Sequence, residues 1–154
     1  MSNQGNGSIL ILFDMYLDAM SNRAVAFSPR RFDRTISKSI MQAGMVRRRG
    51  MLDVWESMRE CPCTSFHSLQ ESHVRCETWP NEGHLNGEVQ LCHYSRDNSE
   101  AAREMVQYIV RVLKPAIWTL LIVRRGPGMA GRTPYPVESV RMKRGWRRPE
   151  IHRW

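Results

Sequence analysis

Cysteine and histidine side chains gather in one stretch of the sequence, between residues 61 and 93. Zinc in proteins takes four tetrahedral nitrogen or sulfur ligands, which usually arrive as close pairs. The pairs Cys63-x3-His67 and His73-x2-Cys76 have usable spacing, and Cys92 would close the site. The candidate zinc ligands are therefore Cys63, His67, His73, Cys76 and Cys92. The stretch as a whole holds all four Cys and four of the five His: Cys61, Cys63, His67, His73, Cys76, His84, Cys92 and His93.

The spacing of this cluster also departs from known zinc signatures. It contains no C-x2-C pair, and the adjacent Cys92 and His93 would point to opposite faces of a strand. The alternative is a set of ordinary thiols and surface imidazoles in a loop-rich segment, in a protein that needs no cofactor. A Cys76–Cys92 disulfide is a further alternative, which a reducing compartment disfavours.

No arrangement of residues in the sequence meets the requirements of a catalytic site. A cysteine nucleophile needs a base held beside it, and the pairs nearest in sequence are Cys76 with His73 and Cys92 with His93. The glycine-rich stretch 126–131 lacks the Lys-Ser/Thr of a phosphate-binding loop. We therefore expect a protein that is not an enzyme.

Positive charge gathers at the carboxyl end. The chain has 23 basic and 15 acidic residues, net +8, and residues 124–154 alone hold 9 basic and 2 acidic residues. Of the basic residues, 20 are arginine, which binds phosphate through two parallel hydrogen bonds. Closely spaced cations neutralise successive phosphates, and tryptophan rings stack on unpaired bases. The candidate nucleic-acid-binding residues are Arg141, Lys143, Arg144, Trp146, Arg147, Arg148, Arg153 and Trp154.

The basic segment has other uses that the sequence leaves open. It is typical of peripheral contact with an anionic membrane, of a nuclear-import signal, or of a solvated tail without a partner. Two further arginine clusters, Arg30-Arg31-Arg34 and Arg47-Arg48-Arg49, are interpreted as solvated faces of helices.

The spacing of apolar residues predicts the elements that would position these groups. We expect helices over 8–27, from Ser28-Pro29 to Gly44, over 51–58, and from near Asp97 to Lys114-Pro115. Turn signals separate two short strands over 73–79 and 88–94. The apolar run 116–123 fits either a buried half-helix or a buried strand. The predicted fold class is mainly α, with α+β as the alternative: a small helical domain, a short Cys/His-rich hairpin and a flexible basic C-terminal tail.

The length of 154 residues fits one domain. We predict a flexible N-terminus over 1–8, a compact domain over 9–123 and a basic, Gly/Pro-rich tail over 124–154. The apolar run 9–13 is too short for a signal peptide, and charges and a proline interrupt the run 105–123. We therefore expect no transmembrane segment, and a cytoplasmic or nuclear location rather than secretion.

The predicted function is binding rather than chemistry: a small basic protein whose tail contacts RNA or another polyanion. The alternative is a protein–protein regulator that docks on a host protein through methionine-rich helical faces, because methionine adapts to irregular surfaces. The Arg-, Ser-, Trp- and Met-rich composition is similar to that of small viral accessory proteins, which are often read from an overlapping frame. The third possibility for this chain is an overlapping or recently arisen reading frame that has no selected function. The methionines of the proposed faces are Met41, Met45, Met51, Met58 and Met105.

Overall fold

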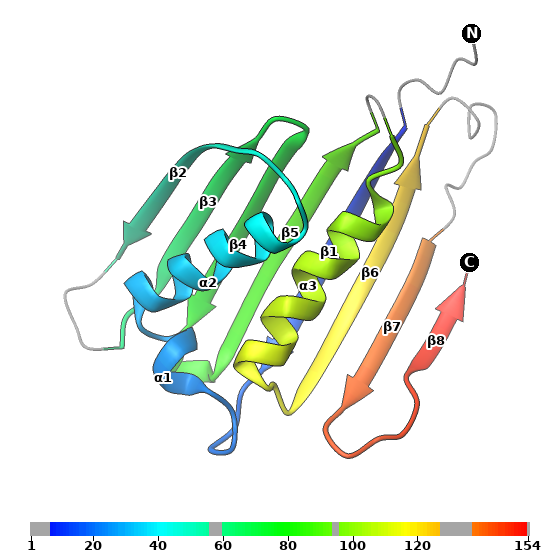
Figure 1. Cartoon of the computed structure of the whole chain (residues 1–154). Helices are drawn as coiled ribbons and strands as arrows, with labels where there is room; N and C mark the ends of the chain where they lie inside the picture. Colours follow the sequence, from blue (N-terminus) through cyan, green and yellow to red (C-terminus); the bar gives the residue numbers. More distant parts are fainter. Residues whose placement is uncertain (1–6, 56–59, 94–95, 127–136, 154) are drawn as a thin grey trace, which may run out of the picture.

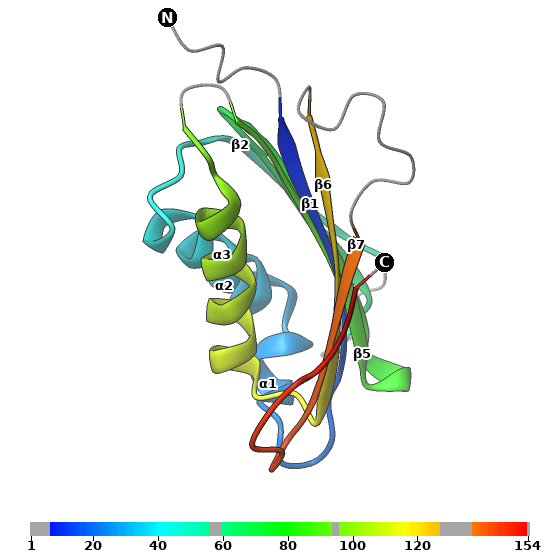
Figure 2. The ribbon, with the colours of Figure 1, turned by 90° about the vertical axis from the view of Figure 1, so that its right-hand side faces the viewer.

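The computed structural model describes residues 7–55, 60–93, 96–126 and 137–153. Eight antiparallel strands form one sheet in the order β2-β3-β4-β5-β1-β6-β7-β8. Helices cover one face of this sheet, which gives two layers (Figures 1 and 2). The strands are β1 (Ser8–Tyr16), β2 (Arg47–Val54), β3 (Cys63–Leu69), β4 (Ser72–Trp79), β5 (His84–Cys92), β6 (Ile117–Arg125), β7 (Val137–Lys143) and β8 (Glu150–Arg153). The helices are α1 (Arg23–Ala26), α2 (Pro29–Gln42) and α3 (Ser99–Leu113), and a 3-10 turn, η1 (Pro80–Glu82), joins β4 to β5.

The predicted mainly α fold class is wrong. Residues 8–16, expected to start a helix, form β1 at the centre of the sheet between β5 and β6. Every second residue from Ile9 to Met15 is fully buried against the helices. Burial therefore alternates with the two-residue period of a β-strand. Leu10, Phe13 and Leu17 also fit a helical spacing, which is why the sequence pattern was ambiguous.

One further element differs from the helical prediction, and the structure decides one alternative that the sequence left open. Residues 51–54 continue β2 instead of starting a helix, and the apolar run 116–123 lies mostly in β6. β6 pairs with β1 on one side and β7 on the other. The carboxyl-terminal segment also contributes β7 and β8 to the sheet, so these parts are not a flexible tail.

Other predicted elements are confirmed. The Ser28-Pro29 signal starts α2, and a second amphipathic helix, α3, ends at Leu113. A carboxylate oxygen of Asp97 accepts the Ser99 backbone N–H at 2.8 Å and so satisfies one donor at the start of α3. The strand predicted over 73–79 corresponds to β4, and the one predicted over 88–94 corresponds to β5, which begins earlier at His84 and ends at Cys92; the two pair as an antiparallel hairpin.

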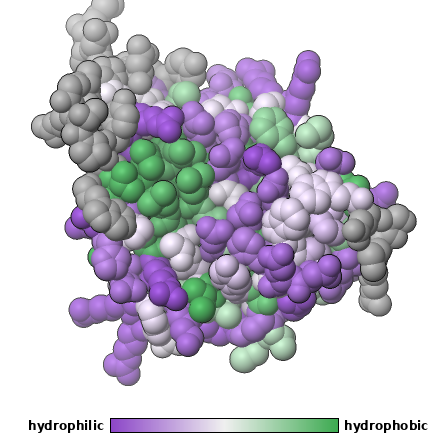
Figure 3. Space-filling model, turned by 180° about the vertical axis from the view of Figure 1, so that it is seen from behind, coloured by the Kyte–Doolittle hydropathy of each residue, from purple (hydrophilic) through white to green (hydrophobic). Residues whose placement is uncertain are grey.

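The two faces of the sheet differ in what covers them. The core lies between the helices and the inward residues of the central strands. The opposite face is uncovered and carries an apolar patch (Figure 3). By strand alternation, the outward apolar residues of β1 and β6 there are Leu10, Leu12, Leu121 and Val123. In the part of the chain that the structure describes, no helix has both the length and the apolar character needed to cross a bilayer.

Candidate functional site

The turn between β3 and β4 holds a serine in an unusual backbone conformation. Ser72 is the first residue of β4, and its φ is +154°. L-residues other than glycine rarely adopt a positive φ. Holding a residue in this conformation costs free energy, which the contacts of the surrounding structure must offset. Strained residues of this kind gather at functional sites, which makes the Glu71–Ser72 peptide a candidate reactive group.

The carbonyl group of Glu71 accepts a hydrogen bond across the strands. The register places Ser72 opposite Leu91, so the next residue, Cys92, lies beside Glu71. The Cys92 backbone N–H donates to the Glu71 carbonyl oxygen at 2.9 Å. A donor in this position stabilises negative charge that develops on the oxygen when a nucleophile attacks the carbonyl carbon.

Ser72, His73 and Glu88 form a chain of polar contacts. The Ser72 hydroxyl lies 3.3 Å from His73 Nδ1, and His73 Nε2 lies 3.1 Å from Glu88 Oε1. If the Nε2 proton is donated to the carboxylate, Nδ1 keeps its lone pair and accepts the hydroxyl proton. The three residues thus have the hydroxyl, base and orienting carboxylate of an activated nucleophile.

Buried polar atoms without partners lie near the same end of the sheet. Among the described residues, the Glu71 Oε2 and Ser99 Oγ atoms are buried and have no hydrogen-bond partner. The Asn98 side chain donates to the Cys92 carbonyl at 2.8 Å, which brings the start of α3 to this end. Buried unsatisfied polar atoms are rare in proteins and require an explanation.

A hollow of about 280 Å³ adjoins the Glu88 end of this chain of contacts. Its lining includes two carboxylates and a guanidinium: Leu12, Phe13, Asp14, Arg75, Asn86, Gly87 and Glu88. Arg75 lies opposite Glu88, three residues along β4 from Ser72, or roughly 10 Å. The hollow therefore holds groups of both signs, of which Arg75 already contacts Glu77 and Asp14 Oδ1 lies 3.0 Å from His84 Nε2.

Comparison with known proteins finds likeness at the level of structure. No protein-family model matches the chain, and no curated protein matches it in sequence. Among the matching solved structures is the crystal structure of the adenosylmethionine decarboxylase from Aquifex aeolicus VF5. The TM-score is 0.66, and the match covers 79% of this chain and 92% of that chain at 18% identity. The chain has the fold of an adenosylmethionine decarboxylase. At this identity the likeness establishes the fold alone.

In this fold the predicted zinc ligands are divided between the two faces of the sheet. Cys63, His67 and Cys76 point toward the helices, whereas His73 and Cys92 point to the uncovered face. Burial raises the pKa of the Cys63 and Cys76 thiols, which disfavours the thiolate that zinc binds. Across the described ranges, no three His, Cys, Asp or Glu side chains gather in a way that could hold a metal ion.

The register also separates the cysteines proposed as a disulfide. Cys76 lies opposite Gly87 and not opposite Cys92, because the β4–β5 hairpin turns at η1. Within the described residues, none of the four cysteines forms a disulfide.

His67 instead lies buried between α2 and β3, where it contacts polar side chains of both elements. Its ring is fully buried, and Nε2 lies 3.1 Å from Asp33 Oδ1 and 3.0 Å from Ser65 Oγ. Ser65 donates its hydroxyl to Asp33 at 2.8 Å. Burial lowers the pKa of His67, although Asp33 opposes this effect. The cluster joins a helix to the sheet through polar contacts.

The predicted nucleic-acid-binding residues differ in whether their side chains are accessible to a ligand. Arg141, Lys143, Trp146, Arg147 and Arg148 are exposed on β7 and the turn that follows it. The other cations, Arg144 and Arg153, contact acidic side chains of this chain, and Trp154 lies outside the described residues.

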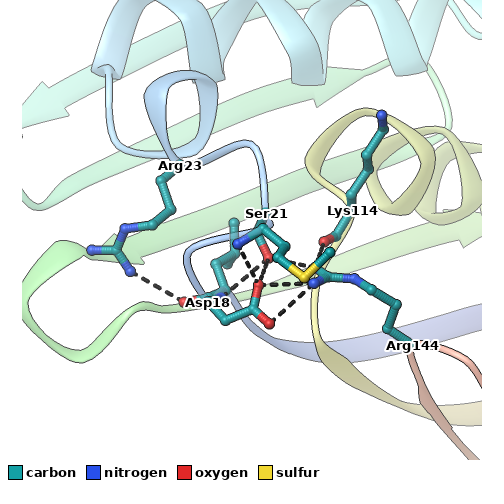
Figure 4. Close-up of polar contacts among 7 residues, drawn as sticks. Asp18, Ser21, Arg23, Lys114 and Arg144 are labelled. Atoms are coloured by element: carbon teal, nitrogen blue, oxygen red, sulfur yellow. Dashed lines mark hydrogen bonds and ion pairs between the residues drawn. The ribbon is translucent and has the colours of Figure 1, made fainter.

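Arg144 fixes the β7–β8 turn to the far end of the sheet (Figure 4). Its guanidinium donates to both carboxylate oxygens of Asp18 at 2.9 and 3.0 Å, to Ser21 Oγ at 2.8 Å and to the Lys114 carbonyl. Desolvation raises the pKa of Asp18, but hydrogen bonds from Arg144, Ser21 and the Met20 N–H outweigh it and hold this pKa below its usual value. Arg144 is thus occupied within the molecule.

The proposed methionine faces are only partly on the surface. Met41 and Met51 are exposed, whereas Met45 and Met105 belong to the core. Met58 lies outside the described residues.

Sequence reasoning missed the residues of the β3–β4 turn. It considered His73 and Cys92 only as partners of cysteine or zinc chemistry, and it passed over Ser72 and Glu88. The neighbouring Ser72 and His73 were visible in the sequence, but Glu88 joins them only through the β4–β5 register.

Proposed function

We propose that the chain is a self-processing decarboxylase whose reactive group forms from Ser72. The observation that carries the proposal is the Ser72 backbone at φ +154°, beside a Glu71 carbonyl that already accepts the Cys92 N–H. The sequence-based expectation of a non-enzymatic protein stays a prediction, and the experiment below separates it from this proposal.

The first step is an attack of the Ser72 hydroxyl on the preceding carbonyl carbon. His73 accepts the hydroxyl proton while Glu88 orients the ring, and the Cys92 N–H stabilises the oxyanion. The bond between the Glu71 carbonyl carbon and the Ser72 nitrogen then breaks, the leaving nitrogen takes the proton from His73, and an ester remains. Release of the strained backbone favours this step.

The ester can break down without an oxidant or reductant. Loss of the Ser72 Cα proton expels the Glu71 carboxylate and leaves a dehydroalanine at the start of the second fragment. Its tautomer reacts with water, releases ammonia and leaves a terminal keto group. Such a keto group would supply the electron-accepting carbonyl that decarboxylation of an α-amino acid requires.

The proposed substrate is adenosylmethionine or a similar cationic amino acid. The structural neighbour is an adenosylmethionine decarboxylase. The hollow beside Glu88 is lined by Asp14, Glu88 and Arg75, which suit a molecule that carries positive charge together with a carboxylate.

The test is whether the purified full-length chain breaks between Glu71 and Ser72. We expect denaturing gels and intact-mass measurement to show fragments 1–71 and 72–154, the second without a free N-terminal amine. Ser72→Ala should remain one intact chain. Glu88→Gln should slow the cleavage by roughly 10–100-fold, because the base loses its orienting carboxylate.

The control is Ser139→Ala, which removes a hydroxyl from β7, away from the turn. This variant should be cleaved like the unmodified chain. A chain that stays whole after prolonged incubation would contradict the proposal. If the chain is cleaved but releases no CO2 from carboxyl-labelled adenosylmethionine, the substrate assignment is wrong while the self-processing site stands.

A second proposal, from the charge pattern, is that β7 and its following turn bind a polyanion such as RNA. It is supported by the exposure of Arg141, Lys143, Arg147 and Arg148 together with Trp146. Arg147→Gln with Arg148→Gln should weaken RNA binding and flatten its dependence on salt, since two fewer counterions are released. Filter binding at two salt concentrations measures this, and an unchanged affinity and salt dependence would refute it.

A further inference from the structure

One edge of the molecule combines cations with exposed aliphatic side chains. Sequence alone separates the arginines of α2 from those of β2, but the packing of the two elements brings Arg34 and Lys38 of α2 beside Arg47 of β2 around one groove. The Arg47 guanidinium donates to Ser37 Oγ on α2 at 3.2 Å. We call the surface formed by Arg34, Lys38, Met41, Val46 and Arg47 the α2–β2 edge.

The positive charge of this edge is not neutralised by the protein. Among the residues that the structure describes, the cations of this edge form no ion pair; they are Arg34, Lys38 and Arg47. Asp33, the acidic residue of α2, accepts the Ser65 hydroxyl and contacts His67 below the helix. The edge therefore presents a positive field to solvent.

Aliphatic side chains on this edge protrude into solvent. Met41 is 72% exposed and Val46 is 50% exposed, next to cations rather than in the core. Between α2 and β2 lies a groove of about 350 Å³ with an aliphatic lining of Ile40, Met41 and Met45 and a rim of Arg34, Lys38 and Arg47. Among the residues that the structure describes, those lining the groove include no acidic side chain and no aromatic ring.

We propose that the α2–β2 edge docks on an anionic lipid surface. The cations would contact headgroup phosphates, while Met41 and Val46 enter the boundary between headgroups and acyl chains. Long basic side chains can place an aliphatic stem in apolar surroundings and the charged end at the headgroups. Single-stranded nucleic acid fits this edge less well, because binding of unpaired bases draws on aromatic rings. The proposal is independent of the chemistry at Ser72.

The test is co-sedimentation of the full-length chain with vesicles. We expect binding to phosphatidylcholine mixed with phosphatidylserine, little binding to phosphatidylcholine alone, and weaker binding as salt increases. Arg34→Gln with Lys38→Gln should weaken binding roughly thirtyfold, since each basic residue near the surface contributes about 1 kcal/mol. Met41→Ser should weaken binding about threefold, and this loss should persist at high salt because it is apolar in origin.

The matched control is Arg111→Gln with Lys114→Gln, which removes the same charge from exposed positions at the end of α3. It should change vesicle binding less than about threefold. Circular dichroism checks that each variant is folded. An equal loss in both double variants would show general charge attraction and overturn the proposal. Failure to bind anionic vesicles, with retention of single-stranded RNA through Arg34 and Lys38, would also overturn it and assign the edge to nucleic acid.

Discussion

Ser72 combines a hydroxyl group with a strained backbone, and substitutions can separate the two. Ser72→Gly and Ser72→Ala both remove the hydroxyl, so both should stay uncleaved. Glycine tolerates the φ of +154°, whereas alanine keeps the strain. We expect Ser72→Gly to have a free energy of unfolding about 1 kcal/mol above that of Ser72→Ala, measured by urea denaturation. Equal stabilities would mean that the backbone at Ser72 stores no strain.

His67 makes the free energy of unfolding depend on pH. Burial lowers its pKa below the usual value near 6.5, so between the two values the unfolded chain binds a proton that the folded chain does not. Stability therefore rises with pH through this window and falls as pH drops below about 6.5. We expect the urea concentration at the unfolding midpoint to be lower at about pH 5.5 than at about pH 7.5. The difference should be smaller in His67→Gln. An identical decrease in that variant would exclude His67 as the source.

At the level of residues, the sequence showed which side chains could react but not which ones meet. It placed His73 and Cys92 in a reactive stretch, and both lie at the candidate site. It also grouped Cys63, His67 and Cys76 with them, although the pleat of the strands sends these three to the other face. A shift of one position along a strand reverses the direction of a side chain, and neither spacing nor composition fixes that register.

At the level of elements, Gly87 sets the contact between β5 and its neighbours. A Cβ atom there would lie 2.4 Å from Phe13 Cζ and 2.8 Å from the Arg75 carbonyl oxygen. We expect Gly87→Ala to lower the free energy of unfolding by about 2–3 kcal/mol, measured by urea denaturation. Gly145→Ala is the control: its φ is +87° but its surroundings are open, so the cost should be about 1 kcal/mol.

A second variant keeps this prediction testable if Gly87→Ala unfolds. Adding Phe13→Leu removes the closest atom, and the double variant should recover part of the lost stability. No recovery would place the strain at the Arg75 carbonyl instead.

The elements that the sequence predicted correctly carry two independent signals each. α2 and α3 combine an apolar stripe with a recognisable start, and the β4–β5 hairpin combines alternation with turn residues. β1 and β6 were ambiguous or wrong because a short apolar run fits both a helix and a buried strand. The choice between these depends on strand partners far away in sequence, as Phe13 opposite Leu120 illustrates.

At the level of the whole molecule, the carboxyl-terminal strands are part of the sheet. β7 pairs along β6, and Val140 packs against the core. We expect a chain that ends after Gly126 to lose at least about 10 °C in Tm and to aggregate, because it exposes the apolar edge of β6. A chain that ends after Trp146 loses only β8 and should unfold within a few degrees of the intact protein, by calorimetry. Equal Tm values for the two truncations would contradict this account.

The central position of β1 has a consequence for synthesis. β1 precedes the other described strands in the chain, but its neighbours β5 and β6 end only at residues 92 and 125, so β1 has no strand partner until β5 has been made. The nascent chain must therefore keep an apolar strand unpaired until residue 92 has been translated, and its second edge open until β6 is complete at residue 125. Its closure depends on contacts between distant parts of the chain, which are slow to form. A circular permutant that delivers β1 after β5 should fold faster on the ribosome and depend less on chaperones.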